Sequence, residues 1–95
     1  MAKNRKKHAQ QIHFRKACIK RVGQILDDQV LVKSIQNQEL EFIDRQSNRI
    51  TRWKYSHNNN DFMIIYDKDR KQVVTIIPYK DGLEESGNNY FWWLD

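Results

Sequence analysis

Hydrophobic and polar positions follow two different periods along this chain, and the period changes near residue 40. Residues 7–22 contain no Gly or Pro, and their apolar members recur at helical spacings until Gly23. This pattern predicts a first helix over residues 7–22. Its apolar stripe is expected to comprise Ile12, Ile19 and Val22 with Cys18 beside them, which leaves Lys16 and Lys20 on a more exposed face.

A second, shorter helix is predicted after residue 28. The pair Asp27-Asp28 offers an N-cap, because an aspartate side chain accepts hydrogen bonds from the free N–H groups of a first turn. The polar run at residues 36–38 marks its end. The expected buried face comprises Val30, Leu31, Ser34 and Ile35.

Beyond residue 40 the period becomes two, which is typical of strands with one buried face. Strands are predicted over 40–45, 50–56, 62–67 and 73–77, joined by short polar connections that suit hairpins. Pro78 is expected to end the last strand because it has no N–H to donate. The predicted fold is a single α+β domain over residues 1–95, with two helices followed by a four-stranded antiparallel meander.

Two amphipathic helices ahead of such a sheet are expected to pack on one of its faces. The other face, or an edge of the sheet, would then remain open for a ligand.

Charge is divided sharply along the chain. Residues 1–22 hold eight Lys and Arg and no acid, whereas residues 23–95 hold nine bases and twelve acids. Such clustering is typical of a surface that contacts a polyanion, although a solvated basic arm at residues 1–7 is the alternative. The candidate nucleic-acid-binding residues are Lys6, Lys7, Arg15, Lys16, Lys20 and Arg21.

The compartment is expected to be the reducing cytoplasm, with no membrane contact. Cys18 is the single cysteine, so it has no partner for an internal disulfide, and its place on the apolar stripe favours a packed, inert thiol. No apolar run is long enough for a membrane span, and the basic start leads into a polar helix instead of the apolar core of a signal peptide.

Candidate catalytic residues alternate along the predicted strands. Arg52 and Lys54 project from one face of the second strand, with Thr51, Trp53 and Tyr55 on the other. Cations with a histidine form a set suited to phosphodiester cleavage, since RNA supplies its own 2′-hydroxyl nucleophile and no metal or other cofactor is needed. The predicted catalytic set is His8, Arg52, Lys54, Tyr66 and Thr75, with His13 as an alternative to His8.

Each of these residues also has an ordinary structural explanation. His8 suits a solvated helix start, Tyr66 suits a core position with its hydroxyl at the rim, and Thr75 is a good strand former. Whether the side chains of these candidate residues lie close together depends on the register between the strands. The sequence does not show this register. Thr75 is expected to share a face with Val73 and Ile77. The three histidines and Cys18 show no compact metal-ligand spacing.

The last segment, residues 79–95, is an aromatic tail. Five of the eleven aromatic residues lie there, and neighbouring tryptophans are difficult to bury together. The tail is therefore a candidate surface for a protein partner or a homodimer, although its acids at 81, 84 and 85 are an alternative cover for the basic helix. The candidate partner-binding residues are Tyr90, Phe91, Trp92 and Trp93.

Residues 7–10 (Lys-His-Ala-Gln), Arg15 and Arg21, followed by the closing hairpin at residues 64–78, resemble a family of small phage and bacterial proteins related to RelE-type toxins. These belong to the barnase, EndoU, colicin and RelE-like group of metal-independent ribonucleases, and the similarity covers residues 7–78. The resemblance implies two helices and a four-stranded antiparallel sheet. It also implies roles for some of the candidate residues: His8 as acid or base, Arg15 or Arg21 and Arg52 or Lys54 as phosphate cations, and Thr75 facing the cleft.

The tail departs from this family, because RelE toxins carry basic and tyrosine residues where this chain is acidic and aromatic. Ribosome-dependent cleavage is therefore not implied. The leading hypothesis is an RNA-acting protein, a metal-independent endoribonuclease or toxin with a possible antitoxin partner. The alternatives are a non-enzymatic phage or mobile-element protein that binds nucleic acid or a host protein, and a homodimeric interaction module.

Overall fold

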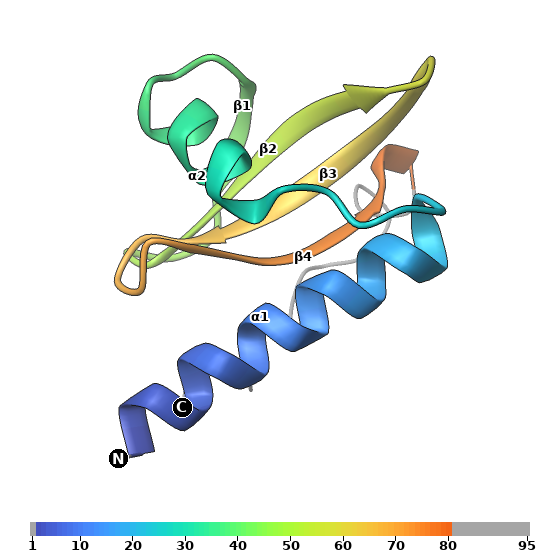
Figure 1. The fold of residues 1–95 in the computed structure, drawn as a ribbon. Coiled ribbons are helices and arrows are strands. Elements are labelled where there is room, and N and C mark those ends of the chain that lie inside the picture. The colour runs from blue at the N-terminus through green and yellow to red at the C-terminus, as the bar shows by residue number, and fades with distance from the viewer. Residues whose placement is uncertain (1, 81–95) are drawn as a thin grey trace.

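The computed structural model describes the backbone of residues 2–80 and the side chains of residues 7–80. Two helices precede four strands along the chain, as the sequence predicts (Figure 1). The elements are α1 (Ala2–Arg21), α2 (Asp28–Gln36), β1 (Glu41–Arg45), β2 (Ile50–His57), β3 (Asn60–Asp67) and β4 (Gln72–Pro78). The α+β class is confirmed, and Pro78 is the last residue of β4.

Both ends of α2 are held by local hydrogen bonds. The carboxylate of Asp27 accepts from the backbone N–H groups of Gln29 and Val30, at 3.0 and 3.3 Å, which confirms the predicted N-cap. At the other end, the N–H groups of Gln38 and Glu39 reach back to carbonyl oxygens of the last turn, at 3.0 and 2.8 Å. This is a Schellman motif, and it places Gln38 in the left-handed region with φ 58°.

The four strands form one antiparallel sheet in the order β1-β2-β3-β4, which is the predicted meander. Direct pairing places Arg52 opposite Ile65 and Lys54 opposite Met63. Paired residues share a face, so the two cations project from the same side of the sheet, as expected. Trp53 and Tyr55 belong to the other side.

The prediction that Thr75 shares a face with Val73 is wrong, whereas Thr75 does share a face with Ile77. The register shifts between β3 and β4, where Ile65 pairs with Thr75 but the next residue, Tyr66, pairs with Val73. Val74 is therefore an extra residue, a β-bulge that breaks the alternation along β4. As a result, Val73 belongs to the hydrophobic cluster on the helix side and Ile77 to the cluster on the other side.

The buried stripe of α1 also differs from the prediction. Ile12 and Ile19 are 37% and 57% exposed. The helix instead buries Phe14, Ala17 and Cys18, of which Phe14 and Cys18 are inaccessible to solvent. A large aromatic ring buries more apolar area than an isoleucine, so the rotation that places Phe14 inside is preferred. Cys18 is packed, as predicted.

The buried face of α2 is shifted by a smaller amount. Leu31 and Ile35 are buried as expected, but Val30 is 57% exposed and Val32 takes its place inside. Positions 28, 31, 32 and 35 lie within a narrower sector of the helix than the predicted set, so they form one continuous buried face.

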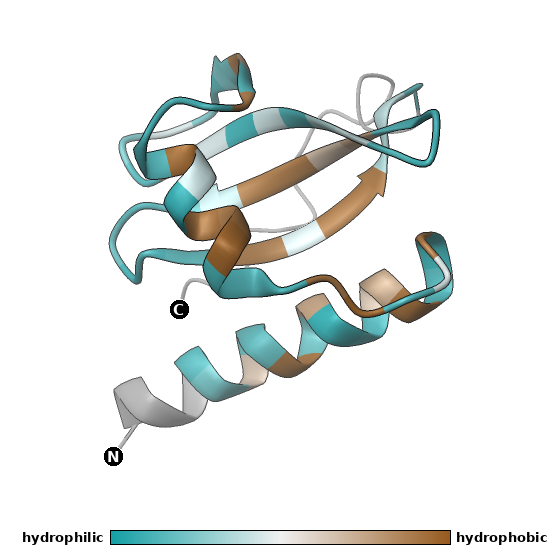
Figure 2. Cartoon of the chain, turned by 45° about the horizontal axis from the view of Figure 1, so that its top comes forward, coloured by the Kyte–Doolittle hydropathy of each residue, from teal (hydrophilic) through white to brown (hydrophobic). Residues whose placement is uncertain are grey.

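Both helices contribute to one hydrophobic cluster on one face of the sheet, which confirms the expected arrangement (Figure 1). The sheet residues in this cluster are Phe62, Ile64, Tyr66, Val73 and Ile76. A second cluster on the opposite face comprises Ile50, Met63, Ile65, Val74 and Ile77. Figure 2 shows the hydrophobic residues concentrated in the central sheet, whereas the turns and most of α1 are hydrophilic.

Helix α1 runs beside the edge strand β4 (Figure 1). At its last residue, the guanidinium of Arg21 donates to the carbonyl oxygen of Ile76 at 3.0 Å and to the hydroxyl of Thr75 at 3.2 Å. These bonds satisfy polar groups that an edge strand would otherwise leave open. Within residues 2–80, neither helix is long and apolar enough to cross a lipid bilayer.

Candidate nucleic-acid interface

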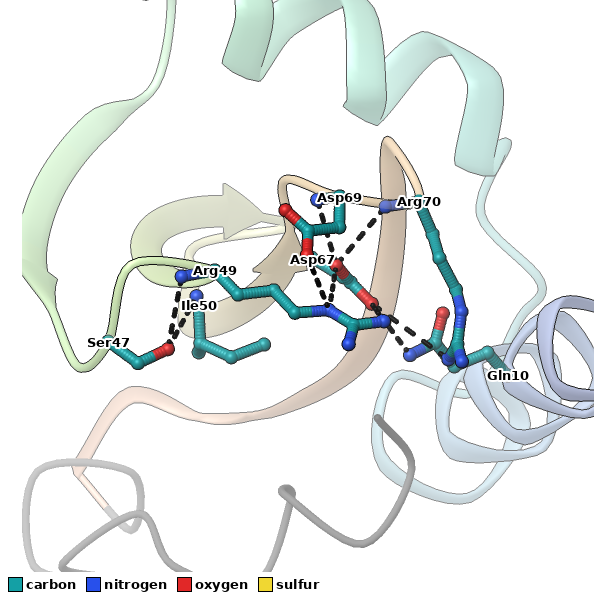
Figure 3. A network of polar contacts seen from close by, with 7 residues as sticks. All are labelled: Gln10, Ser47, Arg49, Ile50, Asp67, Asp69 and Arg70. Carbon is teal, nitrogen blue, oxygen red and sulfur yellow. Dashed lines mark hydrogen bonds and ion pairs between the residues drawn. The ribbon is translucent and has the colours of Figure 1, made fainter. Parts of the chain in front are cut away.

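A buried carboxylate organises one end of the sheet (Figure 3). Asp67, the last residue of β3, has no solvent exposure. The guanidinium of Arg49 donates to both of its carboxylate oxygens, at 2.8 and 3.0 Å, and the side-chain amide of Gln10 on α1 donates at 3.2 Å. The guanidinium of Arg70 lies 4.0 Å from the same carboxylate. One side chain thus joins α1 to two turns of the sheet.

These contacts keep Asp67 ionised. Burial alone raises the pKa of a carboxyl group, but the hydrogen bonds from Arg49, Gln10 and the backbone of Arg70, together with the charge of Arg49, outweigh it and lower the pKa of Asp67.

The same carboxylate shapes the β3–β4 turn, residues 68–71. An oxygen of Asp67 accepts from the backbone N–H groups of Asp69 and Arg70, at 3.0 and 3.2 Å, which is the bonding of an Asx turn. Lys71 ends the turn in the left-handed region, with φ 53°. The turn contains three basic residues, and its backbone is held by a buried anchor.

A basic pocket lies between this turn and α1, with a cavity volume of about 370 Å³. The side-chain amide of Gln72 donates to the backbone oxygen of Lys7 at 2.9 Å, which ties the helix to the start of β4. His8 is exposed and lines this pocket. The complete lining is Lys7, His8, Gln11, Gln29, Arg70, Lys71 and Gln72.

A second, aromatic pocket of about 730 Å³ lies on the other side of the turn, between α2 and the sheet. The rings of Phe42 and Trp53 meet edge to face there, with centroids 5.2 Å apart and planes at 72°. Two lysines of the turn complete it. The lining is Ile35, Gln36, Gln38, Leu40, Phe42, Thr51, Trp53, Tyr66, Lys68 and Lys71.

Lys71 lines both pockets, so they adjoin at the β3–β4 turn. No Asp or Glu is among the lining residues of either pocket within the described part of the chain. Across residues 7–80, the ammonium groups of Lys7, Lys68 and Lys71 form no ion pair. The two pockets together form a basic surface with an aromatic end, suited to an extended anion with planar groups.

The predicted catalytic cations Arg52 and Lys54 lie away from these pockets. Arg52 is 8% exposed and forms a bidentate pair with Asp44, in which its Nε donates at 2.6 Å. The hydrogen bonds from Arg52 lower the pKa of Asp44. The ammonium of Lys54 lies 3.8 Å from Asp61 and 4.8 Å from the ring centre of Tyr79, a cation–π contact.

Tyr66 and Thr75 are buried among neighbours that α1 and α2 supply. The hydroxyl of Tyr66 accepts from the side-chain amide of Gln36 at 3.3 Å and lines the aromatic pocket. Thr75 has no solvent exposure and accepts from Arg21. The five predicted catalytic residues are therefore not brought into one cleft, since Arg52 and Lys54 project from the face of the sheet opposite Tyr66.

The predicted nucleic-acid-binding residues do not all lie at one site. Lys7 lines the basic pocket, whereas Arg15, Lys16 and Lys20 are exposed on α1 outside both pockets. Arg21 is held by β4. The side chain of Lys6 and the predicted partner residues Tyr90, Phe91, Trp92 and Trp93 lie outside the described residues.

Sequence reasoning missed Lys68, Arg70 and Lys71 as site residues. In the sequence, Asp67 and Asp69 stand next to these three bases, so the charge of the segment looks nearly balanced. Only the fold shows that Asp67 points inward and is neutralised by Arg49. Phe42 was also missed, although a large apolar residue on an edge strand is a signal that could have found it.

His13 lies half-buried on α1 and lines neither pocket. Burial, followed by the charges of Arg21 and Lys16, lowers its pKa, so the neutral imidazole is favoured. Across residues 7–80, no group of three His, Cys, Asp or Glu side chains is placed to hold a metal ion.

Comparisons with protein-family models, with curated proteins and with solved structures find no match for this chain.

Proposed function

We propose that this protein acts on RNA, which it binds along the basic pocket and the β3–β4 turn. The observation that carries the proposal is the acid-free lining of two adjoining pockets that share Lys71. Cations that form no ion pair within the described residues, such as Lys7 and Lys71, gain most from neutralising phosphates, because no internal carboxylate competes for them. The resemblance to RelE-type toxins favours RNA over DNA as the polyanion.

The rigidity of the turn supports the same proposal. Asp67 holds the backbone of residues 69 and 70, and Gln72 holds the α1 backbone at Lys7. Phosphate-binding cations on anchored backbone lose less conformational freedom on binding than cations on a free arm. The basic residues of α1 outside the pockets would then add long-range attraction.

The test is the salt dependence of binding to a fluorescein-labelled 12-nucleotide RNA, measured by anisotropy. For single strands, the slope of log K against log salt is about −0.7 per phosphate contact. Lys71→Gln and Lys7→Gln should each weaken binding and make this slope shallower by about 0.7. Lys33→Gln is the matched control, because Lys33 is exposed on α2 and lines neither pocket.

A slope that Lys7→Gln and Lys71→Gln leave unchanged would place the RNA elsewhere. Absence of binding by the unaltered protein would shift the assignment to a protein partner.

Metal-independent cleavage is the second candidate, favoured by the position of His8 beside Lys7 and Lys71 in the basic pocket. A neutral His8 imidazole would take the proton of a ribose 2′-hydroxyl, whose oxygen then forms a bond to the adjacent phosphorus. The bond from phosphorus to the 5′-oxygen breaks, and that oxygen takes a proton from solvent. The products are a 2′,3′-cyclic phosphate and a 5′-hydroxyl, with the lysines stabilising the phosphorane charge.

Cleavage is tested by incubating the RNA with the protein in EDTA and identifying the ends of any fragments. The expected result is fragments with cyclic phosphate ends, lost with His8→Ala while RNA affinity and thermal unfolding are retained. A DNA strand of the same sequence should stay intact because it lacks the 2′-hydroxyl. Intact RNA, or cleavage that His8→Ala leaves unchanged, would remove His8 from this role and leave the binding function.

A further inference from the structure

We propose that the aromatic pocket holds an unpaired base of the RNA, whose phosphates follow the lysines of the β3–β4 turn. The inference rests on the proposed RNA binding and adds its substrate class, which is single-stranded RNA with a base free to leave the stack. A base inside a duplex is stacked on both faces and does not reach a pocket in a protein surface.

The aromatic surface is the first argument. Phe42 is 52% exposed although it is a large apolar residue on an edge strand. Its edge-to-face contact with Trp53 fixes the two rings relative to each other. The indole N–H of Trp53 donates to the hydroxyl of Thr51 at 2.9 Å, so the ring is oriented before any ligand binds. Oriented, partly open rings are a platform for base stacking.

The polar groups of the pocket suit the edge of a base. Gln36 and Gln38 both line it, and their amides offer donors and acceptors together. Gln36 already donates to the hydroxyl of Tyr66, which holds its side chain over the pocket. An amide pair of this kind recognises donor and acceptor groups on a heterocycle, whereas a purely apolar ligand would leave these groups unsatisfied.

Charge identifies the ligand as anionic. Lys68 and Lys71 line the aromatic pocket, and no acid does so among the described residues. Lys71 also lines the basic pocket, together with Lys7. A phosphate bound beside Lys71 would therefore have lysines of both pockets nearby. A volume of about 730 Å³ accommodates a nucleotide, since ligand pockets span roughly 300–1,000 Å³.

The experiment compares two fluorescein-labelled strands of eight nucleotides by anisotropy, one of oligouridine and one abasic at every internal position. The strands carry equal charge, so their difference reports on the bases alone. The unaltered protein should bind oligouridine more tightly. Phe42→Ala should weaken that binding about tenfold and leave the abasic strand unaffected. Phe42→Leu, which keeps apolar contact but removes the ring, should behave like the alanine variant.

Two controls separate this inference from the proposed function. Ile19→Ala removes an equally exposed apolar side chain from α1 and should change neither affinity. Lys71→Gln should weaken both strands. If the protein binds both strands equally and Phe42→Ala changes neither affinity, the aromatic pocket does not bind a base. The proposed RNA binding along the basic pocket and the turn would then still hold. If the unaltered protein binds neither strand, the proposed function fails together with the inference.

Discussion

The guanidinium of Arg49 holds both carboxylate oxygens of Asp67, through its Nε at 2.8 Å and one terminal nitrogen at 3.0 Å. The backbone N–H of Lys68 also donates to the carbonyl oxygen of Arg49, at 2.8 Å. The pair therefore fastens the β1–β2 turn to the β3–β4 turn (Figure 3). It neutralises the buried negative charge of Asp67, and the lysines of the turn are exposed to solvent.

Removing the charge of Asp67 should destabilise the whole domain. Asp67→Asn leaves the Arg49 guanidinium without its buried anion, and we expect the free energy of unfolding to fall by about 3 kcal/mol. Urea unfolding followed by circular dichroism measures this. Asp69→Asn is the matched control, because Asp69 is 66% exposed and 3.6 Å from Arg49, and should cost under about 0.5 kcal/mol. Equal effects of the two variants would contradict a central role for Asp67.

The same pair predicts an acid-dependent loss of stability. Although burial opposes it, the net effect of the contacts lowers the folded-state pKa of Asp67 below the ordinary value of about 3.9. The unfolded chain therefore binds more protons near that pH, and stability falls as the pH drops through and below it. Urea midpoints should fall between about pH 5 and pH 2, more steeply for the unaltered protein than for Asp67→Asn. Parallel curves would show that Asp67 does not contribute.

Gln38 is expected to lower the stability of the fold but to contribute its side-chain amide to the aromatic pocket. Because its φ is 58°, Gln38→Gly should relieve the left-handed strain and raise the free energy of unfolding by about 0.5–1 kcal/mol. The variant should also bind oligouridine more weakly, since the amide is lost. Asn37→Gly, at φ −88°, should not stabilise. A Gln38→Gly protein that is more stable and binds as well would remove Gln38 from the site.

Arg52 and Asp44 are expected to act as a structural pair. A double-mutant cycle with Arg52→Ala and Asp44→Ala should give a coupling of about 1 kcal/mol, because the pair is bidentate but Asp44 is 44% exposed. Arg52→Ala should leave the salt dependence of RNA binding unchanged, since Arg52 lines neither pocket. A clear change in that slope would restore the sequence-based role of Arg52 as a phosphate cation.

The observed rotation of α1 can be tested with truncations at two apolar positions. Phe14 is inaccessible to solvent, so Phe14→Leu should cost about 1–2 kcal/mol and Phe14→Ala about 3–5 kcal/mol. Ile19→Ala, at a position 57% exposed, should cost under about 0.5 kcal/mol. Thermal unfolding compares the three proteins. The reverse order would restore the stripe that the sequence predicts.

Local signals were enough to determine the elements of this fold. The Asp27 cap, the change of period near residue 40 and the short polar connections predict α2 and all four strands to within about two residues. The alternation along β2 correctly separates Arg52 from Trp53, because the period of a strand leaves only two faces. Helix α1 was predicted less well, since its apolar residues allow more than one stripe and tertiary packing selects among them.

The tertiary structure alone decided which residues meet. The bulge at Val74 changes the face of β4 partway along it, and a single extra residue of this kind leaves no mark in the pattern. The side chain of Asp67 points inward and pairs with Arg49. A segment whose charge looks mixed in the sequence therefore presents a basic turn. The pocket residues come from α1, α2 and the sheet, so their juxtaposition depends on long-range packing, which the period of a sequence does not encode.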